Sequence, residues 1–413
     1  MAYRFQPPQE NLLVQTVVNG LYPPLLRIRE NVGRIMVDPQ EGAFLEELRG
    51  RRALILPNHP SETEPSVLVG LARRLGEPFC YVATHEIFHG FDGWLLPQMG
   101  AFSIRRGRPD RPALRTATRL LAEQDRKLVL FPEGETHMCN DLILPLHKGA
   151  IQIGFWTLER LRALGKPTNL SLVPVVIRYR FAGDARPVLL RGIERLERRL
   201  GLPPPPANAA PRDRLLRAGL AVLGGVEREY AVQPPAGASP DERIAALFDY
   251  IAERTAHVLH VSVPAAPTVS LTLRALFNAA FDYVDGLEPG TSAYEKRLHE
   301  RRALTARACL ADLWRVQNFM AISEESLRAP LTVERAGEIL FRLEKEVYGK
   351  PRTRPLRDAF VRIGHPWDLS DDLPAYRASR KTTLAHCTGR LEQQMRALLQ
   401  ASLADGSAPT DFV

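Results

Sequence analysis

The 413-residue chain contains few cysteines and few aromatic residues, and each shortage excludes a class of protein. Its four cysteines are widely spaced and form no C-x-x-C pair, which argues against a disulfide scaffold and predicts a reduced compartment. Aromatic residues make up 7% of the chain, and no known nucleic-acid-binding module can be recognised. We therefore do not expect nucleic acid to be a partner. The cysteines are Cys80, Cys139, Cys309 and Cys387.

Long apolar runs are also lacking. No stretch of 18 apolar residues occurs, so no transmembrane helix is expected. The N-terminal stretch MAYRFQPPQENLL has neither the basic start nor the apolar run of a signal peptide. These features predict a cytoplasmic protein whose contact with a membrane, if it has one, is peripheral. The net charge of +8 favours anionic partners, such as phosphate-bearing substrates or an acidic membrane surface.

Residues 1–50 are predicted to form an N-terminal helical segment. Apolar residues recur at helical spacing from residue 13 to 21, YPP interrupts them, and LLRIRENVGRIMV resumes the pattern to residue 37. One interpretation is a pair of helices packed on the main core. The other is an interfacial anchor in which Arg27, Arg29 and Arg34 face lipid head groups.

Residues 51–262 alternate between strand and helix patterns. Strands are expected at ALILP (53–57), PFCYVAT (78–84), KLVLF (127–131) and LSLVPVVIRYR (170–180). Amphipathic helices are expected at 65–75, 113–124 and 150–165. This alternation predicts an α/β fold with a layered sheet flanked by helices.

Beyond Arg186 the pattern changes. Residues 187–201 are interpreted as one more strand and a helix, and two proline-rich loops bracket a further helix before residue 240. From residue 269 to 405 only helical patterns are found, with no strong strand signal. We therefore predict a helical C-terminal domain over 269–405. The sequence does not say whether this domain serves as a lid, a dimerisation surface or a membrane-docking element.

The stretch LPNHPSETEP carries a candidate proton-transfer pair. The strand before it delivers His59 to the end of a sheet, where open α/β sheets place their sites. A stiff loop between two prolines can hold the Glu64 carboxylate against one imidazole nitrogen and leave the other to accept a proton. The competing interpretation is a capping box from Ser61 to Glu64. Pro65 argues against it, because it has no N–H for an early helical hydrogen bond; we expect Pro65 to be the first residue of the helix.

Two further segments could bind an anion. Residues 101–130 hold eight basic and three acidic residues, and Arg105 and Arg106 lie in GAFSIRRG. Such arginines form either a solvated basic face or a phosphate pocket. In LVLFPEGETH, a turn directly after a strand would present Glu133 and backbone N–H groups at the same sheet edge as His59. Downstream, LHKGA opens a helix whose N-terminal amides favour anions.

The stretch HEIFH fits the zinc pattern H-E-x-x-H through His85, Glu86 and His89. Its context is poor, because Gly90 and Gly93 would end any helix almost at once. The extended form of the motif fails, since Asp92 occupies the glycine position. A zinc peptidase is therefore a remote alternative.

Taken together, the blocks resemble the glycerol-phosphate acyltransferase family, in particular its lysophosphatidic acid acyltransferase group. The first block, N-H followed by an acidic residue, is matched by Asn58, His59 and Glu64, with glutamate in place of aspartate. The second is matched by GAFSIRR, where Arg106 aligns with the phosphate-contacting arginine of the family. The fourth block, a V-P-V strand, is matched by LVPVVI. The K-G-A that usually follows the third block in the family is matched by HKGA. The third block is matched by Phe131, Pro132, Glu133 and Gly134, and Lys148 and Gly149 lie in the K-G-A.

The resemblance covers about residues 50–180 and implies a mixed, mostly parallel sheet and an O-acyltransferase of phospholipid synthesis. The acyl group would pass from acyl-CoA or acyl carrier protein to a hydroxyl of a lysophospholipid or glycerol phosphate. His59 would act as the general base and Glu64 would orient it. Arg106 and Arg105 would hold the acceptor phosphate, and Glu133 and Gly134 would shape its site. No metal or bound cofactor is implied, and an anionic membrane surface is an expected partner.

The third block departs from the family pattern F-P-E-G-T-R, because Glu135 and Thr136 replace threonine and arginine. One expected phosphate contact is lost and a negative charge is added, so the acceptor is expected to differ from simple lysophosphatidic acid. This departure, with the long helical extension, also motivates an alternative function: a catalytically decayed lipid-binding or scaffold protein on an acyltransferase fold.

Overall fold

The computed structural model describes residues 3–105, 110–136, 138–263, 269–285, 292–319, 331–404 and 412. Helices and strands alternate up to residue 181. In order they are α1 (Leu12–Gly20), α2 (Tyr22–Arg29), β1 (Val32–Val37), α3 (Pro39–Glu46), β2 (Ala53–Pro57), α4 (Glu64–Leu75), β3 (Phe79–Thr84), the 3₁₀ turn η1 (His85–Ile87), α5 (Gly90–Gln98), β4 (Ala101–Ile104), α6 (Arg111–Gln124), β5 (Lys127–Val129), α7 (Gly149–Ala163) and β6 (Ser171–Phe181).

A run of helices follows, and the chain then returns to the sheet. The helices are α8 (Arg186–Arg199), α9 (Pro211–Tyr230), α10 (Pro240–Leu259), α11 (Val269–Asp285), α12 (Ala293–Phe319) and α14 (Val333–Tyr348). The last elements are β7 (Arg357–Ile363), β8 (Trp367–Asp368), η3 (Leu369–Asp372), α15 (Leu373–Ala378) and α16 (Arg380–Ala404). We call residues 186–348, as far as they are described, the helical arm.

The strands form one mixed, mostly parallel sheet in the order β1-β7-β6-β2-β5-β3-β4, with β8 beside β6. Within it, β2 pairs in parallel with both β5 and β6, and all five of its residues are buried. Among the strands of the described residues, only the pairs of β6 with β7 and with β8 are antiparallel. This is the expected α/β fold class, and it places the carboxyl ends of β2, β5, β3 and β4 at one edge of the sheet.

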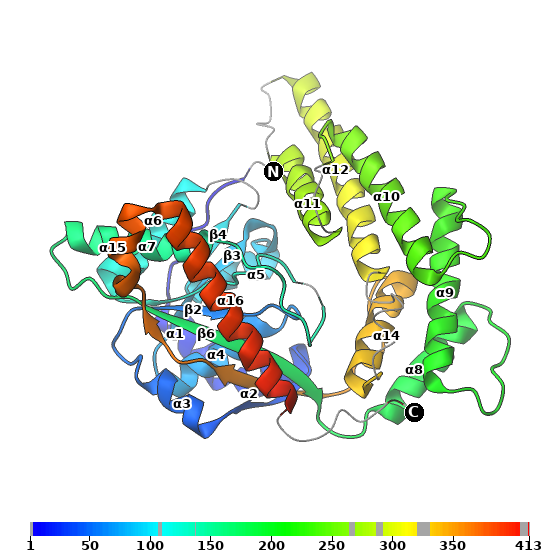
Figure 1. Ribbon diagram of the computed structural model, residues 1–413, viewed down its shortest axis with the longest axis horizontal. Helices are drawn as coiled ribbons and strands as arrows, with labels where there is room; N and C mark the ends of the chain where they lie inside the picture. The colour runs from blue at the N-terminus through cyan, green and yellow to red at the C-terminus, as the bar shows by residue number, and fades with distance from the viewer. Residues whose placement is uncertain are drawn as a thin grey trace.

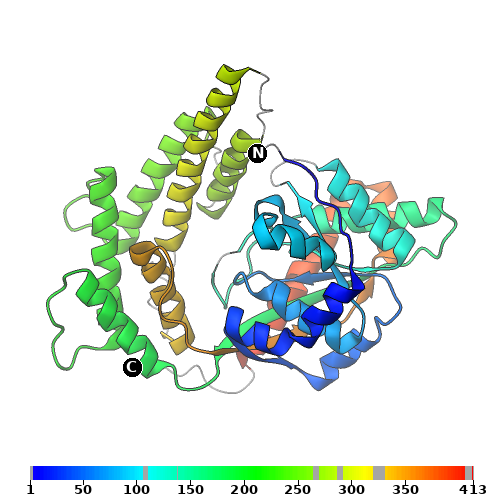
Figure 2. The same ribbon diagram turned by 180° about the vertical axis from the view of Figure 1, so that it is seen from behind.

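Helices cover both faces of the sheet (Figures 1 and 2). Helices α2, α3 and α4 pack on one face, around a core that includes Leu68 and Leu71. Helices α6, α7 and α16 pack on the other, around a core that includes Leu121 and Phe155. In Figure 1 the red helix α16 lies in front of the sheet, and in Figure 2 the dark blue helices α1 and α2 lie in front of it.

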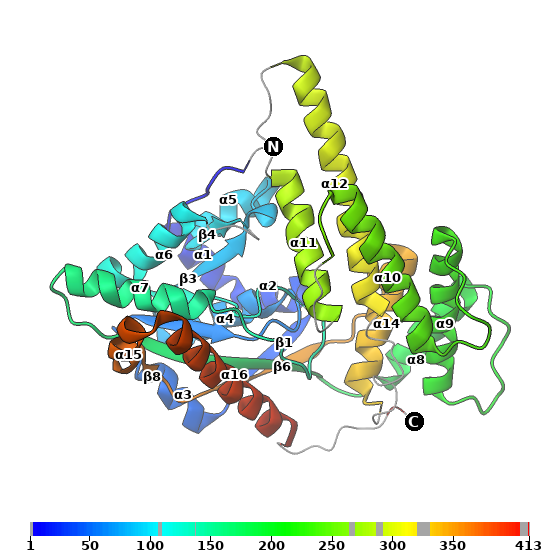
Figure 3. The same cartoon turned by 45° about the horizontal axis from the view of Figure 1, so that its top comes forward.

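The helical arm has a hydrophobic core of its own, formed by α8, α9, α10, α11, α12 and α14. It stands beside the α/β part, with α11 between α12 and the sheet (Figure 3). The core includes Leu215, Leu247, Leu313 and Leu340. The arm is therefore a packed body attached to the sheet by the ends of β6 and β7.

Two sequence-based expectations are wrong because they missed strands. Residues 32–37 form β1 instead of continuing a helix, since Asn31 adopts φ 57° and its side chain donates to the carbonyls of Arg354 and Pro355. Residues 357–363, expected to be helical, form β7 and lie between β1 and β6. Each strand is fixed by the other, because they pair in parallel. A third correction concerns residues 186–199, which form the single helix α8 with no strand.

Candidate active site

His59 and Glu64 lie in direct contact in the loop between β2 and α4. Strand β2 ends at Pro57, and α4 begins at Glu64, one residue before the expected start at Pro65. The Nδ1 atom of His59 lies 2.7 Å from Oε2 of Glu64. The His59 side chain is 17% exposed and that of Glu64 is fully buried. The loop thus shields the carboxylate and leaves the imidazole partly open.

The Glu64 carboxylate receives three further hydrogen bonds. Oε1 accepts from the hydroxyls of Ser61 (2.6 Å) and Tyr179 (2.8 Å), and Oε2 accepts from the backbone N–H of Ser61 (3.1 Å). Burial alone would raise the pKa of Glu64, but the bonds from His59, Ser61 and Tyr179 lower it below its usual range. The ionised carboxylate can only accept, so Nδ1 of His59 carries the hydrogen and Nε2 is the nitrogen left to take a proton.

Ser61 and Tyr179 both donate to Glu64, and neither was predicted from the sequence to be a site residue. Thr63, not Ser61, is the N-cap residue of α4, so the capping box is not formed. Ser61 instead orients the carboxylate. For Tyr179, burial and the negative charge of Glu64 raise its pKa well above the usual range, which keeps its hydroxyl a donor. The S-x-x-E spacing was the available signal for Ser61, whereas Tyr179 is 115 residues away from Glu64.

Phe131 and Glu133 of the third block contact His59 of the first block. The Phe131 ring stacks on the His59 imidazole, with centroids 4.1 Å apart. Glu133 is fully buried; its Oε1 accepts from the backbone N–H of His59 at 2.7 Å and its Oε2 from that of Leu144 at 2.6 Å. Gly134 adopts φ 75°, and a Cβ there would lie 2.8 Å from the His147 ring. The turn therefore requires glycine at this position.

Asn58, Pro132, Lys148 and Gly149 surround these groups in different ways. The Asn58 amide exchanges two hydrogen bonds with the backbone of Ile177 on β6, so it fastens the loop to the sheet. Pro132 accepts from the backbone N–H of His147 at 2.8 Å. Lys148 is exposed at the N-terminus of α7, and Gly149 is the first residue of that helix.

The second block, GAFSIRR, lies farther from His59 and Glu64, the pair that we call the dyad. Arg105 follows β4, which is separated from β2 by β5 and β3. Three strand spacings amount to about 14 Å. The Arg105 backbone N–H donates to Asp110, and its guanidinium carbon lies 6.0 Å from the ring centroid of Tyr3. Arg106 lies outside the described residues. Of the predicted basic pocket, the structure thus places only Arg105, and does not bring it into contact with His59.

The HEIFH stretch does not form the helix that a zinc peptidase needs. His85, Glu86 and Ile87 make a single 3₁₀ turn, and His89 is the N-cap residue of α5. The Nδ1 atom of His89 lies 2.7 Å from the carbonyl oxygen of Glu86. The two histidines therefore do not share one face of a helix, and the local geometry does not support this alternative.

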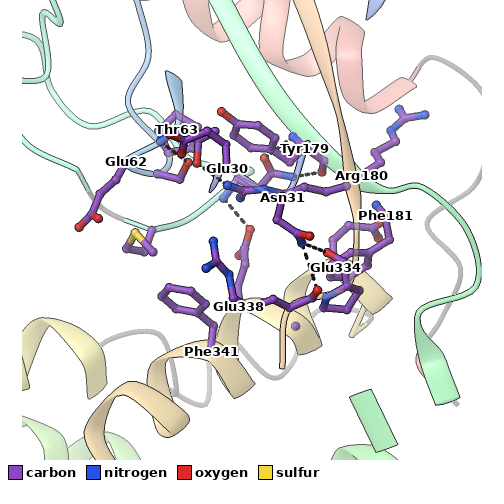
Figure 4. Close-up of a pocket in the computed structure, with 18 of the residues that line it drawn as sticks. Glu30, Asn31, Glu62, Thr63, Tyr179, Arg180, Phe181, Glu334, Glu338 and Phe341 are labelled. Carbon is purple, nitrogen blue, oxygen red and sulfur yellow. Dashed lines mark hydrogen bonds between the residues drawn. The ribbon is translucent and has the colours of Figure 1, made fainter. Parts of the chain in front are cut away.

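A cavity of about 200 Å³ lies between α14 and the loop that joins β2 to α4 (residues 58–63). Figure 4 shows Glu338 and Phe341 of α14 on one side of it and Glu62 and Thr63 of the loop on the other. Ser61 and Tyr179 also line this space. Since both bond to Glu64, a single layer of residues separates the cavity from the buried carboxylate.

Arg274 of α11 reaches the third block and had no signal in the sequence. Its Nε donates to Glu135 at 3.2 Å, and one terminal nitrogen lies 3.3 Å from the carbonyl oxygen of Glu133. Both side chains of the ion pair are 15% exposed. Partial burial and the Arg274 charge lower the pKa of His147 to about 4. The acidic residue that departs from the family pattern is therefore neutralised by the helical arm.

Comparisons with known proteins find similarity over the segment that contains these residues. Residues 39–178 match the family model described as Acyltransferase. The chain is also similar to the 1-acyl-sn-glycerol-3-phosphate acyltransferase of Streptococcus pneumoniae, with 30% identity over 90 residues. That match covers 19% of this chain and 34% of the relative, so the chain spans about a third of the length of that protein. The matched family segment contains β2, the dyad, Glu133 and most of β6.

Proposed function

We propose, from the match of residues 39–178 to the family model described as Acyltransferase, that the chain moves a fatty acyl group from acyl-CoA or acyl carrier protein to an acceptor hydroxyl. The acceptor class is a lysophospholipid or a glycerol-phosphate-like molecule, as in phospholipid synthesis. One observation carries the proposal: the 2.7 Å contact between His59 Nδ1 and the buried, ionised Glu64. It leaves Nε2 of His59 free to act as a general base.

In the proposed mechanism, Nε2 of His59 takes the proton of the acceptor hydroxyl as its oxygen attacks the thioester carbonyl carbon. The positive imidazolium that forms is stabilised by Glu64, whose charge Ser61 and Tyr179 hold in place. When the tetrahedral intermediate collapses, the carbon–sulfur bond breaks and the leaving thiol takes that proton. The products are an ester and a free thiol, and the steps use no group besides these side chains and the two substrates.

We further propose that the anionic part of the acceptor lies along the sheet edge between His59 and the end of β4. Arg105 and Arg106 would supply positive charge there. Lys148 and the first amides of α7, beginning at Gly149, lie beside the third block and would add to it. The wall of the acceptor site would be formed by the third block, Phe131, Pro132, Glu133 and Gly134. Asn58 would stabilise the loop through its hydrogen bonds to β6.

The alternative, a decayed lipid-binding or scaffold protein, is less favoured. A decayed site would have no catalytic need for a buried carboxylate with four hydrogen bonds, whereas here these bonds lower the pKa of Glu64 and keep it ionised beside His59. The loss of arginine at Thr136 is the observation that keeps this alternative open.

We also propose that the enzyme works at a membrane surface, which it contacts through α1, α2 and α5. In the described residues, no helix is long and apolar enough to cross a bilayer. Arg29 of α2 donates to Asp92 of α5, and the residues before α1 bond to the end of α5. Large apolar side chains on these three helices, and Leu21 between α1 and α2, are exposed; those on the helices are Leu12, Leu13, Val17, Ile28, Phe91 and Trp94. Where such side chains gather on helices that contact one another, they typically mark a contact site.

Three arginines were expected to face lipid head groups, and they differ in whether they form ion pairs within the protein. Arg34 is paired with Asp358, and Arg29 with Asp92 and Glu30. Arg27 is exposed and, of the three, is the one best suited to meet an anionic head group.

An acceptor screen with one labelled acyl-CoA tests the proposed reaction. Free thiol should appear only when a lysophospholipid or glycerol-phosphate acceptor is present, and the label should move to that acceptor. Liposome binding without thiol release across the whole panel, with acyl carrier protein as the second donor, would favour the scaffold alternative.

A further inference from the structure

The irregular segment that begins in the third block is held between the loop that joins β2 to α4 and the helical arm. We call residues 133–136 and 138–145 the strap. Toward the loop, Glu133 accepts the His59 backbone N–H, and the Asn140 amide exchanges two hydrogen bonds with the backbone of Tyr179. The strap therefore touches both His59 and a donor to Glu64.

The helical arm holds the opposite side of the strap at successive positions. Gln317 of α12 donates to the carbonyl of Thr136 at 3.3 Å, and Arg342 of α14 donates to that of Met138 at 2.8 Å. Glu338 of α14 accepts from the backbone N–H of Asn140 at 2.9 Å. Side chains of the arm thus form the hydrogen bonds that these backbone groups of the irregular strap would have within a helix or a sheet.

Arg274 holds the end of the strap that is nearest to His59. One of its terminal nitrogens lies 3.3 Å from the Glu133 carbonyl oxygen and 3.5 Å from that of Pro145, and Nε pairs with Glu135. It thereby ties the two ends of the strap to each other and to α11. A planar guanidinium suits this task, because its donors point in fixed directions.

We propose that Arg274 is a positioning residue for His59, and that the helical arm is in this way part of the active site. The connection is short: Arg274 fixes the Glu133 backbone, and the Glu133 carboxylate fixes the His59 backbone. Phe131, two residues earlier, stacks on the imidazole. Loss of Arg274 loosens this connection without removing any group that touches the reacting atoms.

The test compares Arg274→Gln and Arg274→Lys with Arg243→Gln in the full-length chain. Arg243 also joins two segments through an ion pair: it makes a two-pronged pair with Glu227 at 2.8 and 2.6 Å, between α10 and α9 and away from the strap. Since a misplacement of about 1 Å can cost about 100-fold in rate, Arg274→Gln should lower kcat about 10- to 100-fold. The KM for the acyl donor should change less than about threefold, and Arg274→Lys should recover part of kcat, because its single ammonium keeps the charge but not the fork.

The control Arg243→Gln should keep kcat within about threefold while losing as much thermal stability as Arg274→Gln. The proposal is overturned if Arg274→Gln keeps its kcat, or if both variants lose activity in proportion to their melting temperatures.

This inference rests on the proposed acyl transfer, so a second measurement separates the two. The stacked Phe131 ring shifts the NMR signals of the His59 ring protons upfield, and the shift depends on the 4.1 Å separation. In protein labelled at histidine, with His59 assigned from His59→Gln, Arg274→Gln should move that signal and Arg243→Gln should not. If the wild-type protein transfers no acyl group, the proposed function fails. The His59 signal still tests the positioning role of Arg274, because a resonance that does not move in Arg274→Gln refutes it.

Discussion

The backbone N–H of His59 donates a 2.7 Å hydrogen bond to the buried carboxylate of Glu133, which joins the first and third sequence blocks. The second oxygen of the same carboxylate accepts from the N–H of Leu144. Both oxygens of Glu133 are therefore acceptors, and the side chain sets the distance between the loop that carries His59 and the part of the strap around Leu144.

Replacing Glu133 by glutamine should be costly although the shape is kept. The amide group presents one NH₂, which cannot accept, so the N–H of either His59 or Leu144 loses its partner while buried. Such a group costs about 1–3 kcal/mol. We expect urea unfolding to show a loss of this size together with a lower kcat. A Glu133→Gln protein with wild-type stability and turnover would show that the contact does not set the loop position.

His59→Ala should reduce acceptor-dependent thiol release by a factor of about 10² to 10⁴, the usual contribution of a general base. His89→Ala is the matched control, because His89 lies outside the dyad at the start of α5. Its turnover should stay within about twofold of wild type. Equal turnover of the His59→Ala protein would remove this residue from the mechanism, and a specific loss in His89→Ala would revive the metal alternative.

Shortening Glu64 should also impair turnover. Aspartate is one methylene shorter, so it cannot meet His59, Ser61 and Tyr179 together unless the backbone moves. We expect Glu64→Asp to lower kcat about 10-fold and Glu64→Gln about 100-fold, because the neutral amide does not stabilise the imidazolium. Steady-state kinetics with a saturating acyl donor tests this order. The reverse order would indicate that shape matters more than charge.

Glu64 should also make stability depend on pH. Its pKa is lowered on folding, so the ionised form stabilises the folded state above the unfolded pKa of about 4.3. This contribution is lost as the pH falls through the lower folded pKa. The difference in free energy of unfolding between wild type and Glu64→Gln should therefore be constant near pH 7 and shrink below about pH 4.3. Urea unfolding at several pH values measures it, and a difference independent of pH would contradict the lowered pKa.

His147 offers a check on the charge of Arg274. Partial burial and this guanidinium lower the His147 pKa to about 4. Arg274→Gln should raise that pKa, because protonation no longer meets a positive charge. Histidine NMR titration measures the midpoint, and Arg243→Gln should leave it unchanged. A midpoint that stays at about 4 in the Arg274 variant would mean that burial alone lowers it.

The apolar surface on α1, α2 and α5 should control binding to vesicles. Each large side chain that enters the bilayer contributes up to about 1.5–3 kcal/mol. Changing Leu13, Ile28 and Trp94 together to serine should weaken co-sedimentation with vesicles containing phosphatidylglycerol by more than about 10-fold. Leu304→Ser, at a similarly exposed position on α12, is the control. Equal binding of both variants would place the membrane contact elsewhere.

Local patterns predicted the part of the fold in which neighbours along the chain also pack together. Strands β2, β3, β5 and β6 and helices α4, α6 and α7 were all expected within a few residues. Strand β1 was missed because its apolar spacing also fits a helix, and the choice depends on pairing with β7. Val32 pairs with Arg357, more than 300 residues away, and no local signal carries that information.

The same distinction applies to the site. The contact of His59 with Glu64 could be expected, because only four residues of a stiff loop lie between them. Tyr179 and Arg274 could not be, because folding alone brings them to Glu64 and Glu133. Arg274 in particular lies on a helix whose sequence shows only an ordinary amphipathic pattern.

The position of β7 has a consequence for synthesis on the ribosome. Strand β6 is complete at residue 181, but its antiparallel neighbour spans residues 357–363. Until that neighbour emerges, one edge of β6 has unpaired backbone groups, and such edges promote aggregation. At about 5–20 residues per second, translating the intervening 175 or so residues leaves this edge open for about 10–35 s. The helical arm is made during that interval, so it can fold first, and the sheet closes last.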